Sequence, residues 1–174
     1  LAQQTGVPLP KRGENPRDEN AHKINEDARA FFQRTLASAH GASAREYLDH
    51  RGLSKQAIDA FEVGLSPSDG ESLKNHLTRE GYSPEQLASA GVVRIGDDGI
   101  NHDLFRGRLM FPIRDAHGHL VGFGARSLDG SEPKYLNSPQ GPLFDKSRLL
   151  YALDRARMEV RKEGAVIVEG YMDA

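Results

Sequence analysis

The feature that most constrains the fold is a short apolar run, residues 165–168 (Ala-Val-Ile-Val), followed directly by Glu169-Gly170. A run this rich in β-branched side chains is typical of a strand buried on both faces of a sheet. The acid at its end would lie at the carboxyl rim, where open α/β sheets bind ligands and where carboxylate oxygens can hold a divalent cation. An ordinary strand-to-helix turn with an exposed glutamate gives the same short pattern, so the pattern alone leaves both interpretations open.

Composition narrows the classes of protein to which the chain can belong. Of its 174 residues, 37% are hydrophobic and 28% are charged, which is typical of a globular protein with a polar surface. The absence of cysteine excludes disulfides and thiolate zinc sites within these residues. Since neither a membrane-length apolar stretch nor a signal-peptide pattern is present, we expect a cytoplasmic protein that does not act at a membrane.

The charge of the chain is unevenly distributed. The formal net charge is −2, but residues 103–150 carry seven Lys/Arg against five Asp/Glu. This net-positive block lies directly before the apolar run and its acid. Its position, more than its small excess, makes a nucleic-acid partner plausible.

Helical patterns dominate the first half of the chain. Residues 1–24 are polar and contain Pro8, Pro10 and Pro16, which is typical of a linker. Apolar residues then recur at helical spacing, which predicts an amphipathic helix over residues 25–40. Further short helices are expected from the capping box that begins at Ser43, from the cap Ser54, over residues 71–80, and from the capping box that begins at Ser83.

Extended patterns follow. Residues 92–95 precede a Gly-Asp-Asp-Gly turn, and residues 109–113 and 120–128 predict an antiparallel hairpin. From Leu149 to Met158 the pattern is helical again. The predicted fold class is therefore α+β: a helical N-terminal part plus an antiparallel sheet subdomain, leading into the first strand of an α/β domain.

Two basic segments could contact nucleic acid. Arg106 and Arg108 are two residues apart, so on an extended segment both would point to the same face and could bind phosphates. Lys134-Tyr135-x-Asn137 offers a cation, a ring for stacking and an amide, which suits a single strand. The alternative is a solvated sheet face with Tyr135 half in the core.

Two other patterns have simple structural explanations. Gly122-x-Gly124 lacks the third glycine and the helix of a dinucleotide-binding loop, so we interpret its glycines as permitting close approach to a strand. His117 and His119 flank the predicted hairpin turn and lack further ligands nearby, so we do not assign them to a zinc site.

The string Val-Glu-Gly-Tyr-Met-Asp, residues 168–173, resembles the opening motif of the toprim domain in bacterial DNA primases of the DnaG family. Upstream segments resemble the N-terminal half of the same family's RNA polymerase domain, in the same order. These segments are residues 47–54, 105–113, 122–126, 134–138 and 144–146. The resemblance covers about residues 25–174 and implies a linker at 1–24, the N-terminal subdomain of the catalytic core at 25–162, and the start of a truncated toprim domain at 163–174.

The resemblance also implies the residues of the site. A basic surface would guide single-stranded DNA template and meet ribonucleoside triphosphates or the RNA primer. Glu169 would be the catalytic acid that binds metal, with Asp173 as a second metal-site acid, for Mg²⁺ or Mn²⁺. An Asp-x-Asp pair that completes that metal site would lie outside this chain. The basic surface would comprise Arg51, Arg106, Arg108, Arg126, Lys134, Tyr135, Asn137 and Lys146.

The function implied by the resemblance is that of a nucleotidyltransferase that copies single-stranded DNA into short RNA primers during replication. The resemblance also implies zinc bound in an upstream domain and a replicative helicase bound through another region. Both regions would lie outside these residues. This chain would then be an inactive fragment of the enzyme. Two alternatives are another toprim enzyme, such as a nuclease or topoisomerase, and a non-catalytic module that binds single-stranded DNA. The pattern of residues 134–138 is evidence against a nuclease or topoisomerase.

Overall fold

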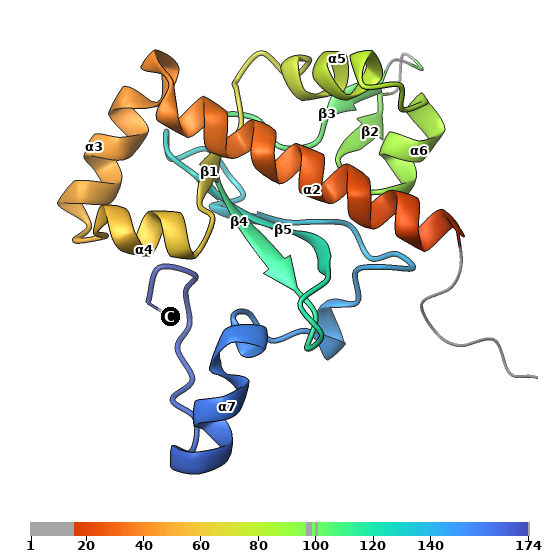
Figure 1. The fold of residues 1–174 in the computed structure, drawn as a ribbon. Helices are drawn as coiled ribbons and strands as arrows, with labels where there is room; N and C mark the ends of the chain where they lie inside the picture. Colours follow the sequence, from red (N-terminus) through yellow and green to blue (C-terminus); the bar gives the residue numbers. More distant parts are fainter. Residues whose placement is uncertain (1–15, 97–98, 100, 174) are drawn as a thin grey trace, which may run out of the picture.

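The computed structural model describes residues 16–96, 99 and 101–173 (Figure 1). Its helices are α2 (Pro16–Ala37), α3 (Ala42–His50), α4 (Lys55–Ala60), α5 (Ser72–Arg79), α6 (Pro84–Ser89) and α7 (Leu153–Glu163), with short 3₁₀ turns η1 (Ala39–Gly41) and η2 (Lys146–Arg148). Its strands are β1 (Gly64–Leu65), β2 (Val93–Ile95), β3 (Asn101–Asp103), β4 (Arg108–Arg114), β5 (Leu120–Ser127) and β6 (Tyr135–Asn137). Helices combined with antiparallel sheets confirm the predicted α+β class. None of the helices in the described ranges is long and apolar enough to cross a membrane.

Helix α2 crosses one face of the main sheet (Figure 1). Its buried stripe starts earlier than the sequence pattern predicted, because Ala21 and Ile24 belong to it. The helix therefore begins at Pro16, and residues 16–24 are helical where a linker was expected. Proline is well suited to the first helical position. The rest of the expected linker, residues 1–15, lies outside the described residues. The stripe continues through Ala28, Phe32 and Leu36.

The main sheet has the order β1-β4-β5-β6, and all its strands are antiparallel. Strand β4 pairs with β5 from Arg108 opposite Ser127 to Ile113 opposite Gly122, so the predicted hairpin is confirmed. One face packs on α2, where the rings of Phe32 and Phe123 meet edge to face at 5.4 Å. The other face forms a second apolar core with residues of α3 and of the β1 segment. This second core includes Leu48, Val63, Leu65, Leu109 and Phe111.

The helix starts predicted at Ser54 and Ser83 are confirmed. The Ser54 side chain accepts a hydrogen bond from the Ala57 N–H at 3.1 Å and caps α4. Ser83 and Gln86 form the complete capping box at the start of α6. Gly52 follows α3 with a φ of +79°, a conformation that glycine adopts without strain.

The capping box predicted at Ser43 does not form. Helix α3 begins at Ala42, with Gly41 as its N-cap, so Ser43 lies inside the first turn. The reason is the 3₁₀ turn η1, which leads directly into α3. Ser38 caps that turn by accepting a hydrogen bond from the His40 N–H at 3.2 Å.

The strand predicted over residues 165–169 is also not formed. In the described structure this segment is irregular, and it follows α7 below the sheet (Figure 1). Val166 is 93% exposed and Ile167 is 79% exposed. A strand is stable only when neighbouring strands satisfy its backbone groups, and within the described residues this segment pairs with no strand.

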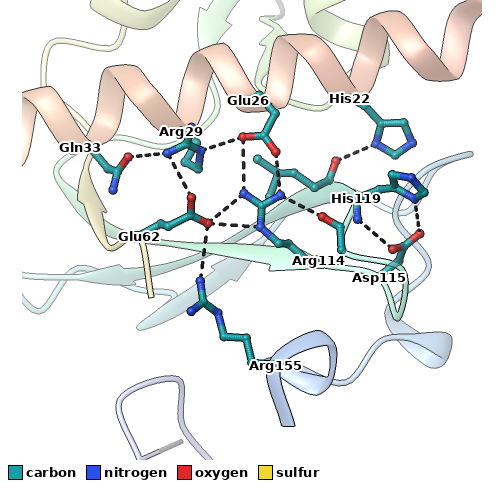
Figure 2. A network of polar contacts seen from close by, with 11 residues as sticks. His22, Glu26, Arg29, Gln33, Glu62, Arg114, Asp115, His119 and Arg155 are labelled. Carbon is teal, nitrogen blue, oxygen red and sulfur yellow. Dashed lines mark hydrogen bonds and ion pairs between the residues drawn. The ribbon is translucent and has the colours of Figure 1, made fainter. Parts of the chain in front are cut away.

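A network of charged side chains joins α2 and β4 to the end of α4 and to α7 (Figure 2). Arg114 of β4 is at its centre: Nη1 lies 2.6 Å from Glu26 Oε1 and Nη2 lies 2.8 Å from Glu62 Oε2. Arg155 of α7 reaches the same Glu62 oxygen at 3.9 Å. Burial opposes ionisation of Glu26, but hydrogen bonds from Arg114 and Arg29 outweigh it and lower the pKa of this carboxyl.

Candidate nucleic-acid interface

A groove of about 910 Å³ lies between β6, η2, α7 and the C-terminal segment. We call it the Tyr171 groove. It brings together five of the predicted site residues, although they come from three separate parts of the chain. Its polar and aromatic lining includes Tyr135, Asn137, Lys146, Glu169, Tyr171 and Asp173.

Arg126 is held between two aromatic rings next to this groove. It lies opposite Tyr135 in the β5–β6 pairing and its Nη1 donates a hydrogen bond to the Tyr135 hydroxyl at 2.8 Å. The guanidinium carbon lies 5.6 Å from the centre of the Tyr47 ring and 5.5 Å from that of Tyr135. Two cation–π contacts and a hydrogen bond fix the position of a positive charge at the surface of the sheet.

Tyr47 was not among the predicted site residues. It lies in α3, four positions before Arg51, and residues four apart on a helix share a face. This spacing was visible in the sequence and could have identified Tyr47 as a neighbour of the basic surface.

Tyr135 is a surface residue. Its side chain is exposed, with 38% of the residue accessible, and its ring meets the Tyr171 ring in a tilted edge contact at 6.0 Å. The alternative placement, half in the core, does not describe this ring. One face of a fixed, accessible tyrosine beside a cation is suited to stacking on a nucleic-acid base.

Exposed cations at or near the groove include Lys134, Lys146, Arg51 and Arg155. Lys146 lines the groove itself, whereas Lys134 precedes Tyr135 at the start of β6. Arg51 lines a smaller adjoining cavity of about 250 Å³, which Tyr171 also lines. Together with Arg126, these cations can attract phosphate, and the acids Glu159, Glu169 and Asp173 line the same groove.

The predicted common face of Arg106 and Arg108 is wrong. Gly107 between them has a φ of +59°, so the extended alternation is interrupted before β4 begins. Arg106 lies beside Gly70 and its Nε donates to the Asp103 carbonyl at 3.3 Å.

Arg108 is buried, with 7% of the residue exposed, and its Nη1 donates to the Pro133 carbonyl at 2.8 Å. It is the neighbour of Leu109, which is the pairing partner of Arg126, so Arg108 and Arg126 lie on opposite faces of the sheet. Arg108 therefore holds the loop before β6 against β4.

Both predicted metal-binding acids, Glu169 and Asp173, are exposed and lie on one turn. The turn is closed by a hydrogen bond from the Asp173 N–H to the Gly170 carbonyl at 3.1 Å. Within the described ranges no group of three or more His, Asp or Glu side chains is placed to hold a metal ion.

The two strand glycines permit close approach, as predicted. A β-carbon on Gly122 would lie 2.7 Å from the Phe144 ring and from Ser138 Oγ, and one on Gly124 would overlap the Tyr171 ring. His119 pairs with Asp115 at 3.1 Å (Figure 2), which accounts for its position without a metal.

Comparisons with known proteins identify the family of the chain. Residues 31–157 match the family model for the N-terminal domain of the DNA primase catalytic core. A DNA primase of Halalkalibacterium halodurans is 39% identical over 181 residues, covering 99% of this chain and 30% of that protein.

Several solved structures are similar to the chain. The RNA polymerase domain of Mycobacterium tuberculosis primase DnaG is 40% identical, with a TM-score of 0.82 over 88% of this chain and 50% of that one. A DnaG primase catalytic domain bound to single-stranded DNA is 38% identical, with a TM-score of 0.80 over 90% of this chain and 51% of that one. The chain thus spans about half of the solved domains and less than a third of the curated relative.

Proposed function

Because the chain belongs to the family of N-terminal domains of the DNA primase catalytic core, we propose that it acts as part of a primase. In this proposal the complete protein copies single-stranded DNA into short RNA primers from ribonucleoside triphosphates. The present residues bind template and nucleotide and contribute the first acids of the metal site.

The observation that carries the proposal is the composition of the Tyr171 groove. A stacking ring, the cation Lys146 and the carboxylates Glu169 and Asp173 lie along one depression, although only the fold brings them together. Cations such as Lys146 would bind backbone phosphates, and Tyr135 would stack on a base or sugar. This set suits a single strand better than a duplex, because the ring needs an unpaired base to stack on.

Glu169 and Asp173 would hold Mg²⁺ or Mn²⁺ together with acids outside these residues. Such a metal neutralises the charge that develops on the transferred phosphoryl group. The role of this chain's own side chains is then placement. Arg126 and Lys146 orient the polyanionic strand, and the turn at Gly170 fixes the distance between the acids and that strand.

The segment that includes Lys134 and Tyr135 favours a primase over a toprim nuclease or topoisomerase, because it resembles the primase pattern. We further propose that the protein acts in the cytoplasm. Zinc in a separate domain and a replicative helicase would be bound by other parts of the complete protein.

The catalytic part of the proposal is tested with the complete protein in which this chain occurs. RNA synthesis is measured on single-stranded DNA with ribonucleotides and Mg²⁺. Glu169→Gln should abolish product, whereas Glu163→Gln, an exposed acid at the end of α7, should leave it unchanged. Full synthesis by the Glu169→Gln variant would show that this acid is not in the active site, and binding without synthesis in the parent protein would identify a binding module.

The binding part is tested by fluorescence anisotropy with labelled single-stranded DNA. Affinity should fall with salt, with a log–log slope of about −0.7 for each phosphate neutralised. Lys134→Ala should weaken binding for all sequences alike and reduce this slope, whereas Lys55→Ala on α4 should not. Affinity that is independent of salt would show that the surface is not a nucleic-acid track.

A further inference from the structure

Tyr171 is the residue that seats the acidic turn on the sheet. Its ring stacks on Phe111 of β4 at 5.1 Å and 17°, and it meets Tyr151 edge to face at 4.9 Å. The space for this ring exists because position 124 is glycine, where any β-carbon would overlap it. Sheet, ring and turn are therefore in direct contact at one point.

The Tyr171 hydroxyl is bound to a residue that the sequence assigned to nucleic acid. It donates a hydrogen bond to Asn137 Oδ1 at 2.6 Å. The side-chain oxygen of Asn137 is thus engaged by the protein itself.

The position of Tyr171 in the turn couples it to both acids. It lies two residues after Glu169 and two before Asp173, inside the turn closed by the Asp173–Gly170 hydrogen bond. Tyr171 and Met172 are half-buried, whereas both acids are exposed. The preceding residues 165–168 are irregular and exposed, so they do not fix the turn. The contacts of Tyr171 therefore determine the positions of the Glu169 and Asp173 carboxylates.

We propose that Asn137 and Tyr171 are positioning residues whose hydrogen bond sets the place of Glu169 and Asp173 relative to the strand-binding surface at Arg126 and Tyr135. Asn137 then acts on metal binding through Tyr171 and does not contact nucleic acid. This inference rests on the proposed function and deepens it, since it assigns an internal role to a residue of the predicted binding surface.

The test measures metal and DNA affinity separately in the complete protein. Mn²⁺ binding is followed by the electron paramagnetic resonance signal of the free ion, which needs no RNA synthesis. Tyr171→Phe and Asn137→Leu should each weaken Mn²⁺ binding about tenfold, as losing a residue that orients a metal ligand does. The double variant should bind Mn²⁺ no more weakly than the single variant with the lower affinity, because both substitutions remove the same hydrogen bond.

Single-stranded DNA affinity, measured by anisotropy, should stay within about twofold for both variants. Lys134→Ala gives the converse result, with weaker DNA binding and unchanged Mn²⁺ binding. The inference is overturned if Asn137→Leu weakens DNA binding and Tyr171→Phe does not. It is also overturned if the two losses of Mn²⁺ affinity multiply in the double variant.

Gly124→Ala approaches the same contact from the sheet side. Its methyl group displaces the Tyr171 ring without removing a polar atom, so it should also weaken Mn²⁺ binding. Circular dichroism establishes that each variant is folded. If the parent protein makes no RNA, the proposed function fails, whereas the Mn²⁺ measurements still decide whether Asn137 and Tyr171 position the acids.

Discussion

The part of the chain before Asp145 and the part after it are stabilised by different contacts. Residues 16–144 supply the buried residues of the apolar cores on the two faces of the main sheet. Every residue of α7, by contrast, is exposed or half-buried, and the segment after it is irregular. Figure 1 shows α7 extending away from the sheet and the segment after it returning toward α4.

The second part touches the first at a few side chains. Tyr151, Tyr171 and Met172 pack at the edges of the cores, and Arg155 reaches Glu62. Stability is therefore a property of the first part, whereas the placement of the acids depends on a small number of contacts. A site built this way is sensitive to single substitutions that hardly change the free energy of unfolding.

The largest difference should come from comparing Phe123→Ala with Ile167→Ala. Phe123 is fully buried between Phe32 and Phe105, so its loss should lower the free energy of unfolding by about 3–5 kcal/mol. Ile167 is 79% exposed, so its loss should change that free energy by less than about 0.5 kcal/mol. Urea denaturation of the two variants checks both values, and similar losses would mean that the tail is packed.

A smaller effect is expected where the two parts meet in the charged network. Arg114→Ala leaves Glu26 and Glu62 without their main partner and should lower the free energy of unfolding by about 2–3 kcal/mol. Arg155→Ala removes only a longer, more exposed contact to Glu62 and should cost less than about 1 kcal/mol. Denaturation curves measure both, and an equal cost would show that α7 is anchored as firmly as β4.

Much of the first part could be predicted because its signals are local. The capping box at Ser83, the cap at Ser54 and the hairpin of residues 109–113 and 120–128 each depend on neighbours close in sequence. The start of α2 was missed because Ala21 and Ile24 add only two apolar residues to a polar stretch, and tertiary packing gives them their role.

The predictions that the structure contradicts depend on strand pairing, backbone conformation and contacts between distant residues, which a local sequence pattern does not contain. An apolar run such as 165–168 becomes a strand only when another strand pairs with it. The alternation rule for Arg106 and Arg108 assumed continuous extended backbone, which Gly107 interrupts. Tyr171 belongs to the motif of residues 168–173, but its hydrogen bond to Asn137 joins residues far apart in sequence.

Substitutions of Tyr135 test whether the first part of the chain, residues 16–144, supplies the binding surface for single-stranded DNA. Tyr135→Ala should weaken single-stranded DNA binding by roughly 1–3 kcal/mol through lost stacking. The matched variant Tyr135→Phe keeps the ring and loses the hydrogen bond from Arg126, so it should retain most of the affinity. Anisotropy titrations at fixed salt measure both. Equal losses in the two variants would assign the effect to the hydroxyl and Arg126 instead of to stacking.

The smallest expected effect is the pH dependence of the charged network. The folded-state pKa of Glu26 is lowered, so its stabilising contribution is present above its unfolded pKa and is lost as the pH falls through the folded pKa. Glu26→Gln should therefore lower the free energy of unfolding by up to about 1 kcal/mol at pH 7.

This difference from the parent should vanish below the folded pKa, where Glu26 is itself neutral. Denaturation between pH 7 and pH 3 measures the change, and Glu163→Gln, at the exposed end of α7, is the control that should stay within about 0.5 kcal/mol of the parent throughout. A cost of Glu26→Gln that is constant across this range would mean that Glu26 contributes by packing and hydrogen bonding alone, and that charge does not join α2 to β4.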